Sequence, residues 1–361
     1  MKATQLLHDA GQSLWLDNIT RALLTSGTLA RYIKELSVTG LTSNPTIFDH
    51  AIGSSQEYDA AICEKTAAGE AGEALFFDLA LEDLTRAADL FRPLHDATNR
   101  VDGWVSLEVS PALAYDSEST LVAAKDLYAR AGRPNLFIKI PGTPEGIPAI
   151  EEAIFAGVPI NITLLFSREQ YLAAAEAYIR GIERRVTAGL NAHVPSVASL
   201  FVSRWDTAVA DKVPSELRGQ LGIAIAKRTY KTYRALLASD RWLRVLNRGA
   251  RSQRLLWAST GTKDPQASDV LYVQSLAAPH SINTMPEKTL LAVADHGDIS
   301  GMLRHDGGDA EAVLDRFARR GIDLDALAIQ LQREGTAAFV KSWDGLLACI
   351  TEKSVKLSQT G

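Results

Sequence analysis

The sequence predicts an α/β protein, a single (β/α)8 TIM barrel with a helical insertion and a C-terminal helical extension. Three observations support this fold class. Short apolar runs alternate with longer amphipathic stretches, a pattern typical of βα units around a parallel sheet. The runs number eight, enough to close a barrel, whereas a doubly wound sheet usually has fewer strands. Polar residues within several runs fall on one face and apolar residues on the other.

The apolar runs are the predicted strands, and the amphipathic stretches are the predicted helices. In chain order the strands span residues 14–16, 38–41, 104–109, 136–140, 158–163, 197–202, 255–258 and 281–284. The helical stretches between them include residues 74–90, 119–131, 168–186 and 215–237.

Two segments exceed a minimal barrel. Residues 58–94 insert extra helix between the second and third strands, and residues 286–294 and 309–350 are predicted helices after the eighth. The last helix is long and amphipathic. It could cover the barrel mouth or an oligomer surface, but its hydrophobic spacing favours ordinary packing. The prediction is therefore one domain over residues 1–361, with the barrel at about 12–300 and the C-terminal helices at about 301–361.

Composition limits the classes of function. The 361 residues are 46% hydrophobic and 22% charged, which is ordinary for a soluble globular protein. The net charge of −5 is intermixed, so a nucleic-acid partner is disfavoured. Cys63 and Cys349 lie far apart, which argues against a disulfide framework or a zinc site and suits a reducing cytoplasm. No signal peptide or membrane-spanning run is recognised, so we expect no membrane partner. A homo-oligomer is compatible with the sequence.

Polar residues converge near the ends of four predicted strands. Strand parity places Lys139 opposite an otherwise apolar face, and the same holds for Asp17, Glu108, Asn161 and Thr163 on their own strands. In a barrel the apolar face contacts the helices and the other face points into the lumen, near the C-terminal mouth where active sites lie. For any single residue of this set, a hydrogen-bonded core group or a strand-end cap is the alternative.

Lys139 suggests a specific chemistry. A lysine inside an apolar strand is rarely buried without a partner, so a structural ion pair with Glu108 or Asp17 is one interpretation. The other is catalytic. Burial penalises the ammonium form of a lysine and frees the lone pair that attacks a carbonyl. The resulting iminium is an electron sink for breaking a carbon–carbon bond, and the two carboxylates would move the protons.

Five sequence blocks, in order, resemble the transaldolase family of class I, Schiff-base aldolases. They are residues 41–48 (LTSNPTIF), 105–109 (VSLEV), 137–141 (FIKIP), 161–167 (NITLLFS) and 199–204 (SLFVSR). Together they cover about residues 14–286. The segment Asn283–Pro286 and the helical tail resemble a longer subgroup of the family, with extra C-terminal helices.

The resemblance implies catalytic roles. Lys139 would form the imine with C2 of a ketose phosphate, and Asp17 would take and return the C4-hydroxyl proton. Glu108 would act through a water molecule during imine formation and hydrolysis, with Thr163 holding that water.

The resemblance also implies substrate contacts. Asn44 and Asn161 would hydrogen-bond the dihydroxyacetone hydroxyls. Arg204 and Ser199 would bind the phosphate; without the family, a surface salt bridge and a cap are the alternatives for these two residues. After the seventh strand, Ser259 matches the family but the expected arginine is absent. Lys263 is displaced from that position, so it is either a second phosphate ligand or a solvated loop lysine.

The implied enzyme is a transferase, sedoheptulose-7-phosphate:D-glyceraldehyde-3-phosphate glyceronetransferase. It would move dihydroxyacetone from fructose 6-phosphate or sedoheptulose 7-phosphate to glyceraldehyde 3-phosphate or erythrose 4-phosphate in the pentose phosphate pathway. No cofactor and no metal are expected, because the iminium replaces a Lewis acid and the histidines lack metal-binding spacing. The alternatives are a fructose-6-phosphate aldolase, a non-catalytic sugar-phosphate-binding barrel and one half of a fused enzyme.

Overall fold

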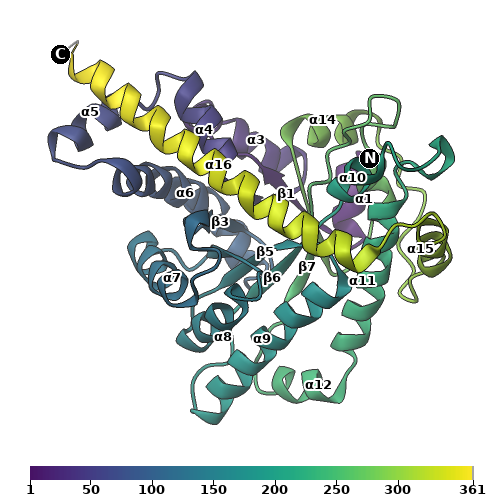
Figure 1. The fold of residues 1–361 in the computed structure, drawn as a ribbon. Helices are drawn as coiled ribbons and strands as arrows, with labels where there is room; N and C mark the ends of the chain where they lie inside the picture. Colours follow the sequence, from purple (N-terminus) through teal and green to yellow (C-terminus); the bar gives the residue numbers. More distant parts are fainter. Residues whose placement is uncertain (360–361) are drawn as a thin grey trace.

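The computed structural model describes residues 1–359 and shows eight parallel strands closed into a barrel, each paired with its neighbours in sequence order (Figure 1). The strands are β1 (Ser13–Asp17), β2 (Val38–Thr42), β3 (Trp104–Glu108), β4 (Leu136–Pro141), β5 (Ile160–Leu165), β6 (Ser196–Phe201), β7 (Arg254–Ala258) and β8 (Ser281–Met285). Every predicted strand is confirmed, with ends shifted by at most two residues. The predicted (β/α)8 fold class is therefore confirmed.

The strand register aligns the polar residues of the lumen. Glu108 pairs with Lys139 across β3 and β4, and Lys139 pairs with Asn161 across β4 and β5. Asp17 pairs with Thr42 across β1 and β2. Paired residues of neighbouring strands project to the same side of a sheet. The register therefore places a carboxylate, an ammonium and an amide in one row around the barrel wall.

The outer face of the barrel is apolar and covered by helices. On β4, Leu136, Ile138 and Ile140 are completely buried and alternate with the lumen residues. Helices α7 (Ser117–Ala131) and α8 (Gly146–Ala156) pack on this strand. Burying one such side chain contributes about 1.5–3 kcal/mol, so these rows hold the helices on the barrel.

Apart from α1, which precedes β1, the other helices up to α14 follow the strands in the order expected for βα units. They are α1 (Ala3–Asp9), α2 (Arg21–Thr25), α3 (Thr28–Glu35), α4 (Pro45–Ser54), α5 (Asp59–Ala67), α6 (Gly72–Ala97), α9 (Arg168–Thr187), α10 (Ser203–Val209), α11 (Leu221–Leu237), α12 (Asp240–Leu246), α13 (Leu271–Ser275) and α14 (Glu287–His296), with 3-10 helices η1 (Pro111–Leu113) and η2 (Ser215–Leu217). One predicted helix is wrong in its extent. Residues 215–237 are interrupted between η2 and α11, where Gly219 has a φ of 71°, a conformation that no α-helix continues through.

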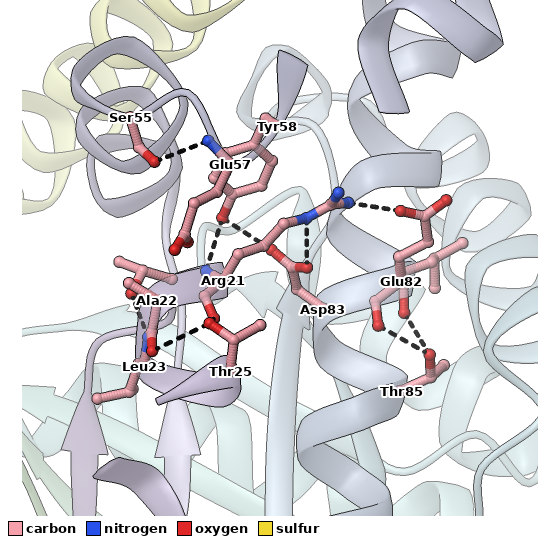
Figure 2. A network of polar contacts seen from close by, with 12 residues as sticks. Arg21, Ala22, Leu23, Thr25, Ser55, Glu57, Tyr58, Glu82, Asp83 and Thr85 are labelled. Carbon is pink, nitrogen blue, oxygen red and sulfur yellow. Dashed lines mark hydrogen bonds and ion pairs between the residues drawn. The ribbon is translucent and has the colours of Figure 1, made fainter. Parts of the chain in front are cut away.

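The insertion between β2 and β3 contains α5 and α6, as predicted, and is fastened to the first βα loop. Arg21 Nε lies 3.0 Å from Asp83 Oδ1, and the Tyr58 hydroxyl donates to Asp83 Oδ2 at 2.8 Å. Figure 2 shows Arg21 and Tyr58 converging on this carboxylate of α6. Because Asp83 is completely buried, the two donors compensate the loss of its hydration.

The C-terminal segment forms two helices, where the sequence predicted one over residues 309–350. Helix α15 (Ala310–Ala318) ends before Gly321, whose φ of 80° breaks the chain direction, and α16 (Leu324–Ser358) follows. Figure 1 shows α16, in yellow, running across the barrel. Gln332 on α16 donates to the backbone carbonyls of Gly142 and Leu164, both at 2.9 Å.

Helix α16 packs against other helices and also covers the barrel mouth. It lies along α4, α5 and α6, and it also contacts β5. None of the helices within residues 1–359 combines the length and the apolar composition needed to cross a membrane.

Candidate active site

A cavity of about 640 Å³ opens at the carboxyl ends of the strands, the end of the barrel where active sites are built. Its wall includes most of the site residues predicted from the sequence: Asp17, Asn44, Lys139, Thr163, Ser199, Arg204, Ser259 and Lys263. Glu108 and Asn161 contact these residues from behind the wall.

Lys139 is buried at the bottom of this cavity and has three neighbours. Its Nζ donates to Glu108 Oε2 at 2.9 Å and to the carbonyl oxygen of Ser43 at 3.3 Å. The same Nζ lies 5.4 Å from the centre of the Phe339 ring on α16. The ion pair with Glu108 therefore exists, but its lysine also borders an open cavity, which a purely structural pair does not require.

Two carboxyl groups lie around this lysine, the buried Glu108 and the half-buried Asp17. Burial raises the pKa of Asp17, and the Thr42 hydrogen bond and the charges of Lys139 and Lys263 oppose that effect. Burial also raises the pKa of Glu108, opposed by Lys139 and reinforced by Asp17. Each carboxyl group consequently takes up a proton more readily than an exposed one, a property suited to proton transfer.

Asp17 is oriented by two threonines that the sequence interpretation did not single out. The Thr42 hydroxyl donates to Asp17 Oδ1 at 2.7 Å and lies 2.6 Å from the Thr284 hydroxyl. A hydroxyl has one proton, so Thr42 must accept from Thr284 while it donates to the carboxylate. Both threonines line the cavity from strand ends, and strand parity was the signal that could have revealed them.

Asn161 lies beneath the cavity wall and is completely buried. Its Nδ2 donates to Ser106 Oγ at 3.1 Å, and its Oδ1 accepts from Ser199 Oγ at 2.7 Å. Ser199, which does line the cavity, uses its only proton in that bond and faces a ligand as an acceptor. The amide thus positions Ser199.

Among the predicted site residues, two buried oxygen atoms have no hydrogen-bond partner within residues 1–359. They are Glu108 Oε1 and Thr163 Oγ1. Buried polar atoms are rarely left unpaired, so both are available to a small polar molecule in the site. Thr163 lines the cavity beside Lys139, and Glu108 already contacts that lysine through its other oxygen.

Asn44 explains the local structure of the TSNP motif. Its side-chain Oδ1 caps α4 by accepting from the Ile47 amide at 3.1 Å, and Pro45 occupies the first helical position. The amide nitrogen of Asn44 has no partner within residues 1–359, and the residue lines the cavity. The cap therefore leaves a donor for a ligand.

Arg204 lies at the opposite side of the cavity, on α10. Its guanidinium carbon lies 5.2 Å from the Phe201 ring centre and 5.8 Å from that of Phe339. No carboxylate among residues 1–359 forms an ion pair with it, and burial lowers its pKa. Gly335 on α16 makes room for it, since a Cβ there would lie 2.9 Å from Arg204 Nη1.

Ser259 and Lys263 flank this side from the loop after β7. Ser259 has a φ of 56°, in the left-handed region, and its Oγ lies 2.8 Å from Ser203 Oγ. Lys263 is exposed, borders the cavity and forms no ion pair within the described chain. It is close enough for its charge to affect Asp17.

The sequence interpretation missed the two aromatic residues of the site. Phe201 shares the lumen face of β6 with Ser199, so strand parity could have identified it. Phe339 comes from α16, far away in sequence, and its helical pattern carried no sign of the cavity. Residues 1–359 contain no cluster of three or more potential metal ligands, and both cysteines are free.

The chain is similar to known proteins over nearly its whole length. The family described as Transaldolase/Fructose-6-phosphate aldolase matches residues 14–350. The Transaldolase of Saccharopolyspora erythraea is 44% identical over 97% of both chains, and that of Mycobacterium tuberculosis is 44% identical over 94% of both. Transaldolase 2 of Nostoc punctiforme is 39% identical over 96% of both.

Proposed function

Since the chain belongs to the transaldolase/fructose-6-phosphate aldolase family, we propose that it transfers dihydroxyacetone between sugar phosphates through an imine on Lys139. It is a transaldolase, a transferase of the pentose phosphate pathway, like the relatives of that name that it matches over nearly their full length. The observation that carries the mechanism is a buried lysine that borders the cavity and is held by one buried carboxylate, with a second beside it.

Imine formation begins with a proton transfer along the hydrogen bond between Lys139 and Glu108. The raised pKa of Glu108 helps its carboxylate accept the ammonium proton. The neutral amine attacks C2 of the ketose phosphate, and the carbinolamine then loses water. Glu108 returns its proton to the leaving hydroxyl through a water molecule held by Glu108 Oε1 and Thr163 Oγ1, the two unpartnered oxygens.

Carbon–carbon cleavage uses Asp17. Its carboxylate takes the C4-hydroxyl proton, the C3–C4 bond breaks, and the bonding electrons enter the iminium to form an enamine. The first aldose phosphate leaves and a second binds. The enamine attacks its aldehyde carbon, and Asp17 returns the proton to the new hydroxyl. Thr42 keeps the carboxylate in one orientation during both steps.

Substrate binding is divided between the two ends of the cavity. Asn44 donates to a dihydroxyacetone hydroxyl near Lys139. Asn161, predicted to contact these hydroxyls directly, instead positions Ser199, whose proton is already used, so Ser199 suits a hydroxyl donor better than the phosphate predicted from the sequence. Arg204, Ser259 and Lys263 bind the phosphate at the other end. A guanidinium without an internal carboxylate partner is free to bind a phosphate with two hydrogen bonds.

Transfer rather than simple cleavage requires an enamine that survives until the acceptor arrives. Phe339 lies near both Lys139 and Arg204, and Phe201 lines the cavity beside Arg204, so the two rings keep water and protons from the enamine. These rings favour transfer over aldolase-type cleavage and over a non-catalytic barrel.

We extend the proposal to the setting of the enzyme. The reaction needs no cofactor and no metal, since the iminium supplies the electron sink. A cytoplasmic location suits the exposed free thiol of Cys63. Three further proposals concern the whole protein. The chain forms one domain, in which the barrel ends near residue 300 and the C-terminal helices begin near residue 301. It binds no nucleic acid, and it assembles as a homo-oligomer.

A product assay tests the proposed reaction. Fructose 6-phosphate is supplied with and without erythrose 4-phosphate, and sedoheptulose 7-phosphate and free dihydroxyacetone are both measured. We expect sedoheptulose 7-phosphate only with the acceptor, and little free dihydroxyacetone in either case. Steady release of dihydroxyacetone without acceptor would identify an aldolase, and neither product would indicate a non-catalytic barrel.

A further inference from the structure

A second cavity, of about 350 Å³, opens at the opposite end of the barrel from the active site. It lies among the first residues of the strands, including Ser13 of β1, Trp104 of β3 and Arg254 of β7. This end of a TIM barrel usually serves stability. The size of the cavity nevertheless falls within the range of small-molecule sites.

The cavity carries positive charge that the protein does not neutralise. Arg254 is paired, since its Nη1 lies 3.1 Å from Asp102 Oδ1 and its Nη2 donates to Ser13 Oγ at 2.6 Å. Among residues 1–359, Asp102 is the only carboxylate that lines the cavity. Arg100 and Arg251 also line it, and no carboxylate among residues 1–359 forms an ion pair with either. Two guanidinium groups therefore remain unpaired in a chain with a net charge of −5.

The neighbouring histidines respond to this charge. Burial lowers the pKa of His193, and the charges of Arg251 and Arg100 lower it further. Burial also lowers the pKa of His280, with added effects from Arg234 and Arg254. The surroundings thus disfavour another cation and favour an anion.

Two residues that line the cavity have an uncommon backbone conformation, and a third has an acceptor oxygen without a partner. Arg100 and His280, on two of its sides, have φ values of 67° and 60°, a backbone region that residues other than glycine rarely adopt. Gln12 lines the cavity and is completely buried. Its Nε2 donates to the Leu276 carbonyl at 2.7 Å and to Ser281 Oγ at 2.9 Å, but its Oε1 has no partner within residues 1–359.

We propose that this cavity binds a small phosphorylated polyol or sugar. Arg100 and Arg251 bind the phosphate, and Gln12 Oε1 accepts a hydrogen bond from a hydroxyl group. The carbon chain lies near the inner wall, which includes Trp104 stacked on Phe137. The site is separate from the transfer reaction, because its residues lie at the opposite strand ends from Lys139.

Calorimetric titration with glucitol 6-phosphate tests this site. This probe has no carbonyl and cannot form an imine. The titration is made on the Arg204→Ala variant, which weakens phosphate binding at the active site. We expect one bound probe per chain. Adding Arg100→Ala and Arg251→Ala should weaken its binding at least ten-fold, as should the gentler pair Arg100→Gln and Arg251→Gln.

Arg248→Ala is the matched control on the same Arg204→Ala background. Arg248 is exposed, as Arg100 is, and has no ion pair in the described chain, but it does not line the cavity. We expect unchanged binding with Arg248→Ala and no binding of glucitol, which lacks the phosphate. Thermal unfolding without ligand verifies that each variant is folded.

Three outcomes would overturn the proposal. One is no binding of glucitol 6-phosphate by the folded Arg204→Ala variant, and another is undiminished binding after both Arg100 and Arg251 are replaced. The third is an equal loss with Arg248→Ala, which would indicate general charge attraction. Inorganic phosphate that bound as tightly as glucitol 6-phosphate would exclude the polyol part.

Discussion

The two halves of the active-site cavity are built in different ways. The lysine half comes from strand ends and is held by short hydrogen bonds, such as those joining Lys139 to Glu108 and Thr42 to Asp17. The phosphate half comes from α10, the loop after β7 and α16, and Arg204 is held there by aromatic rings without an ion pair. The chemistry therefore rests on the rigid barrel, and substrate recognition rests on elements added to it.

Asp17→Asn should cause the largest loss, because it removes proton transfer in the lysine half. The amide still accepts the Thr42 hydrogen bond but cannot take the C4 proton. We expect kcat to fall by about 10²–10⁴-fold with little change in KM, measured by the transfer assay. Glu108→Gln serves as the comparison, because it should instead slow imine formation. A large rise in KM with unchanged kcat would contradict the assigned role.

Asp206 anchors α10, and with it the phosphate half, in a pH-dependent manner. Burial raises its pKa to about 6 from 3.8, although Tyr272 and the amides of Leu221 and Gly222 donate to it. A raised pKa in the folded state means that stability from this group is complete below pH 3.8 and is lost as pH rises through about 6. The loss amounts to about 3 kcal/mol.

Asp206→Asn should remove this pH dependence. Urea unfolding between pH 4 and pH 7 is compared for the two proteins. We expect the stability of the variant relative to the original to increase toward pH 7. A constant difference across this range would mean that Asp206 does not titrate there.

Arg204→Ala should weaken phosphate recognition in the other half. The loss of a charge-assisted, two-point contact is expected to raise KM for both ketose and aldose phosphates by about 10–100-fold, with a smaller effect on kcat. Steady-state kinetics with phosphorylated and unphosphorylated acceptors measures this. If both kinds of acceptor were affected equally, Arg204 would not be the phosphate ligand.

Phe339→Ala tests how α16 links the two halves. The ring lies over both Lys139 and Arg204, so its loss opens the enamine to water. We expect transfer to slow by about ten-fold and release of free dihydroxyacetone to rise. Ser342→Ala, on the same helix, removes a hydrogen bond to Thr46 without touching either cation and should leave the product ratio unchanged.

Lys263→Ala should have the smallest effect. Lys263 is exposed and has no fixed partner in the described chain, so water and salt weaken its contact with the phosphate. We expect KM for phosphorylated acceptors to rise by a few-fold, more at low salt than at high salt. An unchanged KM at low salt would remove Lys263 from the phosphate site.

The difference between the strand-borne lysine half and the phosphate half also explains what the sequence could predict. The strands and the meeting of Asp17, Glu108 and Lys139 followed from the two-residue period, because that period decides which side chains enter a lumen. The breaks at Gly219 and Gly321 depended on single backbone angles, which apolar patterns do not reveal. The sequence pattern also does not reveal contacts between residues that lie far apart in the chain.

Two contacts illustrate this second limit. Phe339 reaches Lys139 only because α16 crosses the barrel mouth, and that path depends on bonds such as those of Gln332 to strand-end carbonyls. The Thr284 contribution to Asp17 likewise depends on the closure of the barrel between β1 and β8. Neither follows from the spacing of residues along the chain.

Borohydride trapping tests the central claim most directly. The protein is incubated with fructose 6-phosphate, reduced with sodium borohydride, digested and mapped by mass spectrometry. A reduced dihydroxyacetone adduct is expected on Lys139, and none on the Lys139→Met variant. The absence of an adduct, or its location on another lysine such as Lys263, would contradict the Schiff-base mechanism proposed for this site.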